Sequence, residues 1–267
     1  QLEIEAPLCY HSAYDRRTFA AIHLLEDLVA TKSATFCNHK TYVTRAMADD
    51  MIDLLAALHG RFYGDRTLAE RYRWLASYPR WFTIGAAKMG TEYYTRKAFD
   101  AAAHVIPEEV MARRDDVWPA TMRALALHDS EPQGLIHSDV HIGNWYRTGA
   151  GQMGLCDWQC LSRGHWSRDF AYAVTASLTP DNRRSWEHEL LARYVERFAE
   201  KTGVKPDFDL SFLRYRQQIV HALAMWTITL CHSPLLPNMQ PEDTTLTMIE
   251  RMTTAMADLD ALDSFKD

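Results

Sequence analysis

The stretch HSDVHIGN at residues 137–144, followed by DW at residues 157–158, decides the fold of this 267-residue chain. Asn144 comes five residues after Asp139, a spacing that suits a loop turning back into a strand. The gap between Asn144 and Asp157 has the pattern of two short strands joined by a glycine-rich turn at residues 149–151. Because a hairpin returns its far end beside its near end, we expect Asp157 to lie next to Asn144.

These three side chains carry the oxygen atoms that phosphoryl transfer requires. A carboxylate must stand near the attacking hydroxyl group, and Mg²⁺ must be held against the phosphate oxygens by hard oxygen ligands. The pattern therefore predicts that Asp139 accepts or orients the proton of an acceptor hydroxyl group. It also predicts that Asn144 and Asp157 hold Mg²⁺ between them.

The segment resembles the catalytic loop of aminoglycoside phosphotransferases and choline-kinase-like enzymes, whose pattern is His-x-Asp-x-x-x-x-Asn. Cys156-Asp157-Trp158 is similar to the Ile-Asp-Trp of that family. The resemblance implies a protein-kinase-like fold and ATP-dependent phosphorylation of a hydroxyl group on a small molecule, with ATP or GTP and Mg²⁺ as cofactors. It further implies that Asp139 is the catalytic base, that His137 anchors the loop and that Asp169 braces it from the start of a helix.

The resemblance extends to a second segment, Leu24-Leu25-Glu26-Asp27-Leu28. It is similar to the hinge between the two lobes of these kinases, where backbone groups meet the adenine edge. Leu25, Glu26, Asp27 and Leu28 are therefore the expected nucleotide-binding residues. Residues 215–226 are similar to a bacterial branch of phosphotransferases related to ecdysteroid-kinase-like proteins.

The expected fold class is α+β, mostly a helical carboxyl-terminal lobe with a remnant β-hairpin of the amino-terminal lobe. Residues 1–28 form the remnant and hinge, and residues 29–267 form the helical lobe with the catalytic loop and the metal-binding ribbon. Two apolar, aromatic-rich stretches separated by a polar turn predict hairpin strands at residues 6–13 and 18–25. Helical spacing and turn residues predict helices from about residue 44 to 60 and at 66–78, 108–127, 166–178, 182–202, 209–231 and 242–261, with Asp181, Asp209 and Thr244 as N-caps.

Two features of the small lobe do not occur in the sequence. There is no G-x-G-x-x-G motif, and the first lysine, Lys32, comes after the hinge-like segment. We expect the amino-terminal part of the small lobe to lie outside the printed sequence. A pseudokinase-like binding module without the nucleotide-clamping lobe is the alternative, and a metallohydrolase using His137, Asp139 and His141 is a remote one.

Composition narrows the classes of partner and the cellular locations that are expected for the protein. The net charge of -6 argues against a nucleic-acid partner, which needs a basic face. No apolar run is long enough for a membrane span, and the first residues lack the pattern of a signal peptide. Five widely spaced cysteines favour reduced thiols and a cytoplasmic protein. The partners expected are a nucleotide and a small hydroxyl-bearing acceptor, whose identity the sequence leaves open, as it does the oligomeric state.

Overall fold

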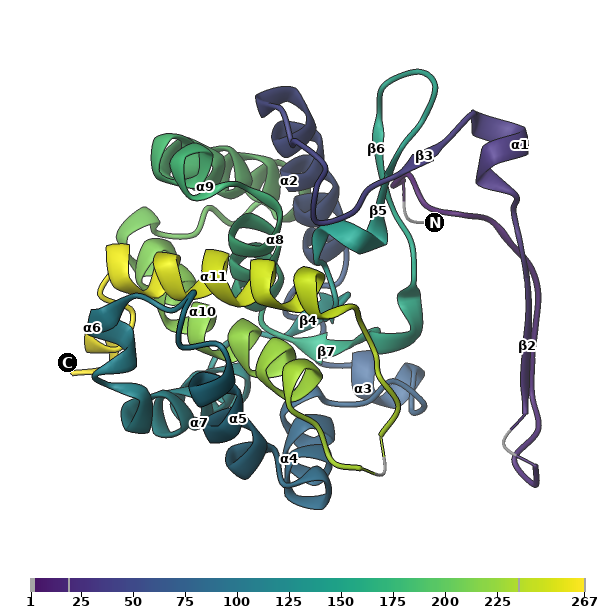
Figure 1. Cartoon of the computed structure of the whole chain (residues 1–267). Helices are drawn as coiled ribbons and strands as arrows, with labels where there is room; N and C mark the ends of the chain where they lie inside the picture. The colour runs from purple at the N-terminus through teal and green to yellow at the C-terminus, as the bar shows by residue number, and fades with distance from the viewer. Residues whose placement is uncertain (1–2, 19, 235, 267) are drawn as a thin grey trace.

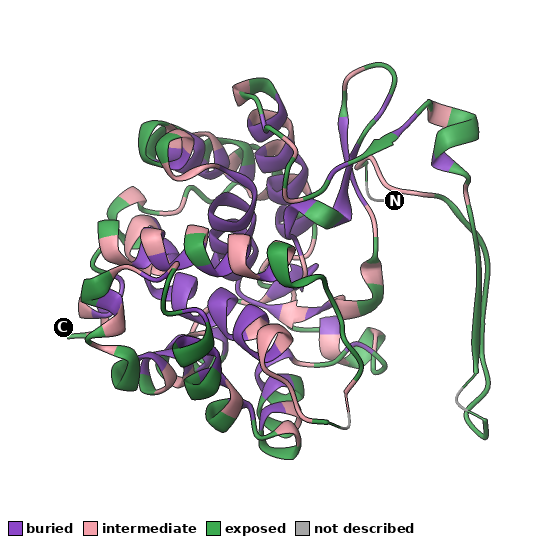
Figure 2. Ribbon diagram, viewed as in Figure 1, coloured by how far each residue is buried: buried purple, intermediate pink, exposed green. Residues whose placement is uncertain are grey.

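A computed structural model describes residues 3–18, 20–234 and 236–266. A helical body carries three small antiparallel sheets, so the predicted α+β class is confirmed (Figure 1). The first sheet is a two-stranded ribbon, β1 (Cys9–Tyr14) and β2 (Ala21–Leu25), which projects from the body. All of its strand residues are exposed, as the green ribbon in Figure 2 shows. The predicted hairpin is confirmed with shorter strands, and Phe19, within the predicted second strand, lies outside the described residues.

The other two sheets hold the segment that the sequence singled out. Strands β3 (Thr35–Phe36), β5 (Trp145–Arg147) and β6 (Met153–Leu155) form one sheet, with Trp145 opposite Leu155. Strands β4 (Gly134–Ile136) and β7 (Ser162–Gly164) form the other. Short 3-10 turns, η1 (Ile142–Asn144) and η2 (Trp158–Cys160), follow β4 and β6. The predicted β-ribbon after Asp139 is thereby confirmed.

Several of the longer helices pack against α8 (Ser167–Ser177), in which every residue is buried. Apolar residues at helical spacing on α2 (Arg45–Gly60) face this core, and Thr44 caps that helix by accepting from the Met47 amide at 3.3 Å. The remaining helices of the described chain are α1 (Leu28–Lys32), α3 (Leu68–Arg71), α4 (Tyr78–Met89), α5 (Thr91–Ala101), α6 (Glu108–Met111), α7 (Arg114–Ser130), α9 (Pro180–Thr202), α10 (Phe208–Leu230), α11 (Glu242–Asp258) and the 3-10 turn η3 (Asp263–Phe265). Within the described residues, none of the helices combines the length and the apolar character needed to cross a membrane.

Several local predictions were wrong. The helix expected at 66–78 is reduced to α3, because Pro79 in the first turn of α4 marks a new helix start. The helix expected at 108–127 divides into α6 and α7. The N-caps of α9 and α10 are Thr179 and Asp207, two residues before the predicted Asp181 and Asp209, and Thr244 lies inside α11, which begins after Pro241.

Glu5, ahead of the ribbon, ties the chain to the β5–β6 hairpin. Its carboxylate accepts from the Tyr146 hydroxyl at 2.6 Å and pairs with Lys32 at 2.5 Å. Its carbonyl oxygen accepts from the Leu155 amide at 3.1 Å. The two ends of the segment that carries the ribbon are therefore fastened at one place on the body.

Candidate active site

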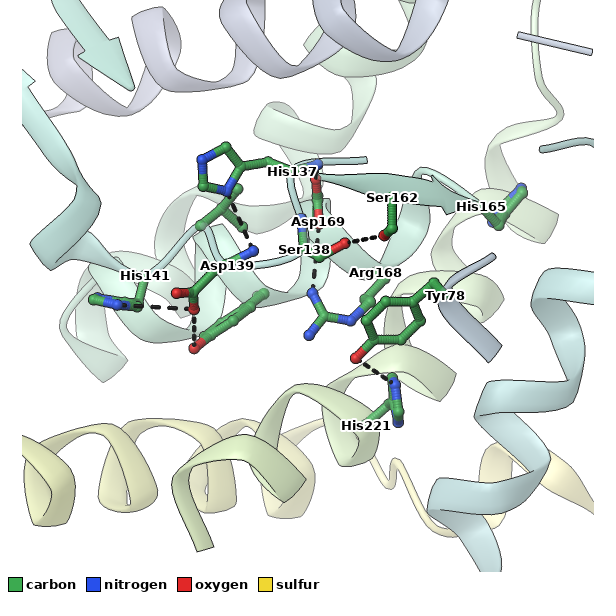
Figure 3. A network of polar contacts seen from close by, with 12 residues as sticks. Tyr78, His137, Ser138, Asp139, His141, Ser162, His165, Arg168, Asp169 and His221 are labelled. Atoms are coloured by element: carbon green, nitrogen blue, oxygen red, sulfur yellow. Dashed lines mark hydrogen bonds and ion pairs between the residues drawn. The ribbon is translucent and has the colours of Figure 1, made fainter. Parts of the chain in front are cut away.

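The loop from His137 to His141 connects β4 to η1, and Asp169 of α8 holds its backbone. The Asp169 carboxylate accepts from the His137 amide at 2.6 Å and from the Ser138 amide at 3.0 Å (Figure 3). Ser138 has a φ of 71°, a conformation that a non-glycine residue adopts at a cost. The two bonds to Asp169 and a 2.6 Å bond from Ser138 to the Ser162 hydroxyl maintain that conformation.

Asp169 is completely buried and is surrounded by donors. His59 Nε2 lies 3.3 Å from its Oδ2, and Arg168 Nη1 lies 3.5 Å from its Oδ1. Burial alone raises the pKa of this carboxyl group, but the His59 hydrogen bond and the nearby Arg168 charge outweigh it and hold the pKa below its usual value. Asp169 therefore stays ionised as the acceptor for the loop.

The two histidines of the loop have fixed roles. His137 Nδ1 accepts from the Asp139 amide at 3.2 Å, so its Nε2 carries the proton and donates to the Cys156 carbonyl oxygen at 3.0 Å. His141 Nδ1 accepts from the Gly143 amide at 3.1 Å, which directs its Nε2–H toward Asp139, 3.8 Å away. Burial lowers the pKa of both imidazoles, so both are neutral near pH 7.

The carboxylate of Asp139 lies on the loop and is partly exposed to solvent, with 25% of the side chain exposed. Tyr172 donates to its Oδ1 at 3.2 Å, and Asn144 Nδ2 donates to its Oδ2 at 3.2 Å and to its carbonyl oxygen at 2.7 Å. The structure thus brings Asp139 and Asn144 into direct contact, with the carboxylate reachable from outside.

The β5–β6 hairpin brings the Asn144 end and the Asp157 end of the segment together. The Cys156 amide donates to the Asn144 carbonyl oxygen at 2.9 Å, and the exposed Asp157 follows with a φ of 59°. Asn144 engages Asp139 through its Nδ2, which directs its carbonyl oxygen Oδ1 elsewhere. One amide oxygen and one carboxylate match the hard ligands that Mg²⁺ prefers, so this donor set fits the ion. Within the described residues no group of three His, Cys, Asp or Glu side chains has the arrangement of a metal site.

The hinge-like segment is held mainly by its own polar groups. The Glu26 amide donates to the Leu8 carbonyl oxygen at 2.8 Å, and the Asp27 side chain caps α1 by accepting from Val29 and Ala30. Leu25 ends β2 in an exposed position, whereas Leu28 is buried at the start of α1. Contact of Leu25, Glu26, Asp27 and Leu28 with a nucleotide stays a prediction.

Sequence reasoning missed three residues around the loop. His59, Arg168 and Tyr172 all touch Asp139 or Asp169, although the sequence reasoning gave none of them a role at the site. A signal for Tyr172 was present, because residues three apart on a helix share a face and Asp169 already pointed to the loop. His59 lies 110 residues from Asp169, and no spacing rule connects such a pair.

The site thus consists of a buried aspartate that holds a loop, on which the partly exposed Asp139 contacts the side-chain amide of Asn144. Residues 6–214 match the phosphotransferase enzyme family (APH), and the chain belongs to this family. The family expected from the loop and hairpin motifs is thereby confirmed.

Solved structures with similar chains include the choline kinase LicA from Streptococcus pneumoniae, with 13% identity over 93% of this chain and 74% of that one and a TM-score of 0.49. An ethanolamine kinase from Plasmodium vivax has 11% identity over 97% of this chain and 68% of that one, with a TM-score of 0.48. An aminoglycoside phosphotransferase from Alicyclobacillus acidocaldarius has 15% identity over 97% and 76%, with a TM-score of 0.47. Comparison with curated proteins gave no match.

Proposed function

We propose that the protein transfers the γ-phosphoryl group of ATP or GTP to a hydroxyl group of a small molecule. The observation that carries the proposal is the contact of the half-buried Asp139 with Asn144, at the base of the hairpin that also bears Asp157. Membership of the phosphotransferase family supports the same chemistry. The hinge-like segment at Leu25–Leu28 is the proposed nucleotide contact. A cytoplasmic location fits the five free thiols of the chain.

The proposed step uses Asp139 as the base. The acceptor oxygen attacks the γ-phosphorus, the bond from that phosphorus to the β–γ bridging oxygen breaks, and the hydroxyl proton passes to a carboxylate oxygen of Asp139. Asn144 Oδ1 and the Asp157 carboxylate would hold Mg²⁺, which neutralises charge on the phosphate oxygens. Asp169 maintains the loop conformation that orients Asp139.

The metallohydrolase alternative does not fit the loop. Both His137 nitrogens are engaged, one by the Asp139 amide and the other by the Cys156 carbonyl oxygen. His141 uses its Nδ1 to accept from Gly143. A zinc site that included His137 would have to break one of the two bonds of this imidazole.

The proposal is tested with the full-length protein and a panel of hydroxylated acceptors, such as choline-like amino alcohols, aminoglycosides, sugars and sterols. Mg²⁺-dependent phosphorylation of one acceptor, lost in Asp139→Asn and retained in the exposed control Asp181→Asn, is the expected result. Calorimetry with ATP and Mg²⁺ should show weaker binding for Asp157→Ala than for wild type. Nucleotide binding without transfer to any acceptor, unaffected by Asp139→Asn, would support the pseudokinase-like alternative instead.

A further inference from the structure

The carboxylate of Asp139 is held from behind by a buried tyrosine. Tyr172 is 1% exposed and donates its hydroxyl to Asp139 Oδ1 at 3.2 Å, while Asn144 donates to Oδ2 at 3.2 Å. Each carboxylate oxygen therefore receives one side-chain donor. Among the described residues, the Tyr172 hydroxyl donates only to Asp139.

The surroundings of Tyr172 keep it in place as a donor. The Arg168 guanidinium is completely buried and lies over two aromatic rings, 4.4 Å from the Tyr78 centroid and 5.3 Å from the Tyr172 centroid. Such contacts hold a ring against a cation in a desolvated site. Burial and the Asp139 charge raise the pKa of the Tyr172 hydroxyl well above its usual value, so it remains protonated.

His141 and Trp226 are two further aromatic residues near this tyrosine. The Trp226 ring meets His141 edge-on at 5.2 Å between centroids, and His141 lies 6.2 Å from Tyr172. Among the described residues, the indole N–H of Trp226 has no acceptor with hydrogen-bonding geometry, yet its proximity acts to lower the pKa of Tyr172. The His141 ring therefore lies next to Tyr172, whose hydroxyl donates to Asp139.

We propose that Tyr172 is a positioning residue for Asp139, held in place by Arg168. This inference rests on the proposed function. Asp169 fixes the backbone of the loop, and Tyr172, three residues later on the same face of α8, fixes the orientation of its reactive side chain. One helical turn thus sets both, as Figure 3 shows for the grouping of Asp139, Arg168 and Asp169. A loop carboxylate that is a quarter exposed would otherwise rotate, and displacement of a reacting group by about 1 Å costs up to about 100-fold in rate.

The test is Tyr172→Phe in the full-length protein, which keeps the ring and removes one buried oxygen atom. We expect kcat to fall about 5- to 20-fold, while the KM values for the nucleotide and the acceptor stay unchanged. The matched control is Tyr215→Phe, which also loses a buried hydroxyl, one that links α10 to Glu187 of α9 at 2.8 Å. A kcat equal to wild type, or an equal loss in the control, overturns the proposal.

A second arm does not depend on activity. Crystal structures of the wild type and of Tyr172→Phe should show the Asp139 carboxylate in one orientation in the first and in two or more orientations in the second. An unchanged, singly occupied Asp139 in the variant overturns the positioning role. If the wild type phosphorylates nothing, the proposed function fails, and this second arm still decides whether Tyr172 orients Asp139.

Discussion

Replacing Asp169 by asparagine tests how the catalytic loop is held. The carboxylate accepts from two backbone amides and stands beside the buried Arg168. Asparagine offers one acceptor oxygen, so one loop amide loses its partner, at about 1–3 kcal/mol. Arg168 also loses its counter-charge, and breaking a buried charge pair costs about 3–5 kcal/mol. Because both losses arise at the same carboxylate and neighbouring contributions do not add, we expect a total of about 3–5 kcal/mol.

Urea unfolding followed by circular dichroism near pH 7 measures this loss in Asp169→Asn. Asp139→Asn is the matched control: it changes the same chemical group on a partly exposed side chain and should alter stability by less than about 1 kcal/mol. Because the pKa of Asp169 lies below its unfolded value, its stabilisation is complete above about pH 4 and is lost as the pH falls through the folded pKa. A loss below about 1 kcal/mol for Asp169→Asn would refute the bracing of the loop by this carboxylate.

Three further outcomes follow from the packing. Burial lowers the pKa of His128 to about 3, so the free energy of unfolding decreases as the pH falls below about 6.5. In urea unfolding between neutral pH and about pH 5, wild type should lose about 2 kcal/mol more than His128→Asn, and equal losses would contradict this. A Cβ at Gly154 would overlap the Tyr146 ring, so Gly154→Ala should lower the free energy of unfolding by about 1–3 kcal/mol and weaken Mg²⁺–nucleotide binding measured by calorimetry. Unchanged stability together with unchanged binding would exclude the overlap. In thermal unfolding, Thr179→Ala should lower the free energy of unfolding of the protein by about 1 kcal/mol, because it removes the N-cap of α9, and Asp181→Ala should lower it by only a few tenths of a kcal/mol. The reverse order would favour Asp181 as the cap.

The sequence predicted the parts of the site that are local. The hairpin that follows Asn144 is present because its turn and its two short strands are encoded by adjacent residues. The contact of Asn144 with Asp139 follows from a spacing of five residues across one loop. In both cases residues close together in the sequence define the geometry.

The parts that the sequence did not predict depend on packing between distant segments. Tyr172 reaches Asp139 only because α8 runs through the middle of the body, and His59 reaches Asp169 only because α2 packs beside it. The errors in helix boundaries have a similar origin. Asp181 has the residue type of an N-cap, but Thr179 followed by Pro180 provides a start two residues earlier.

The fastening of Glu5 has a mechanical consequence. Glu5 and Lys32 lie on either side of the β1–β2 ribbon. Glu5 is tied to the β5–β6 hairpin through the Tyr146 hydroxyl and the Leu155 amide, whereas Lys32 pairs with Glu5 and accepts from the Gly149 amide of the hairpin turn at 2.8 Å. We therefore expect the ribbon to act as a lever about this attachment, so that a displacement of residues 9–18 or 20–25 reaches the strands next to Asn144 and Asp157. Hydrogen exchange at the Leu155 amide, with and without nucleotide, measures that transmission directly: a change in its protection on binding is expected, and an invariant rate would show that the lever is uncoupled from the hairpin.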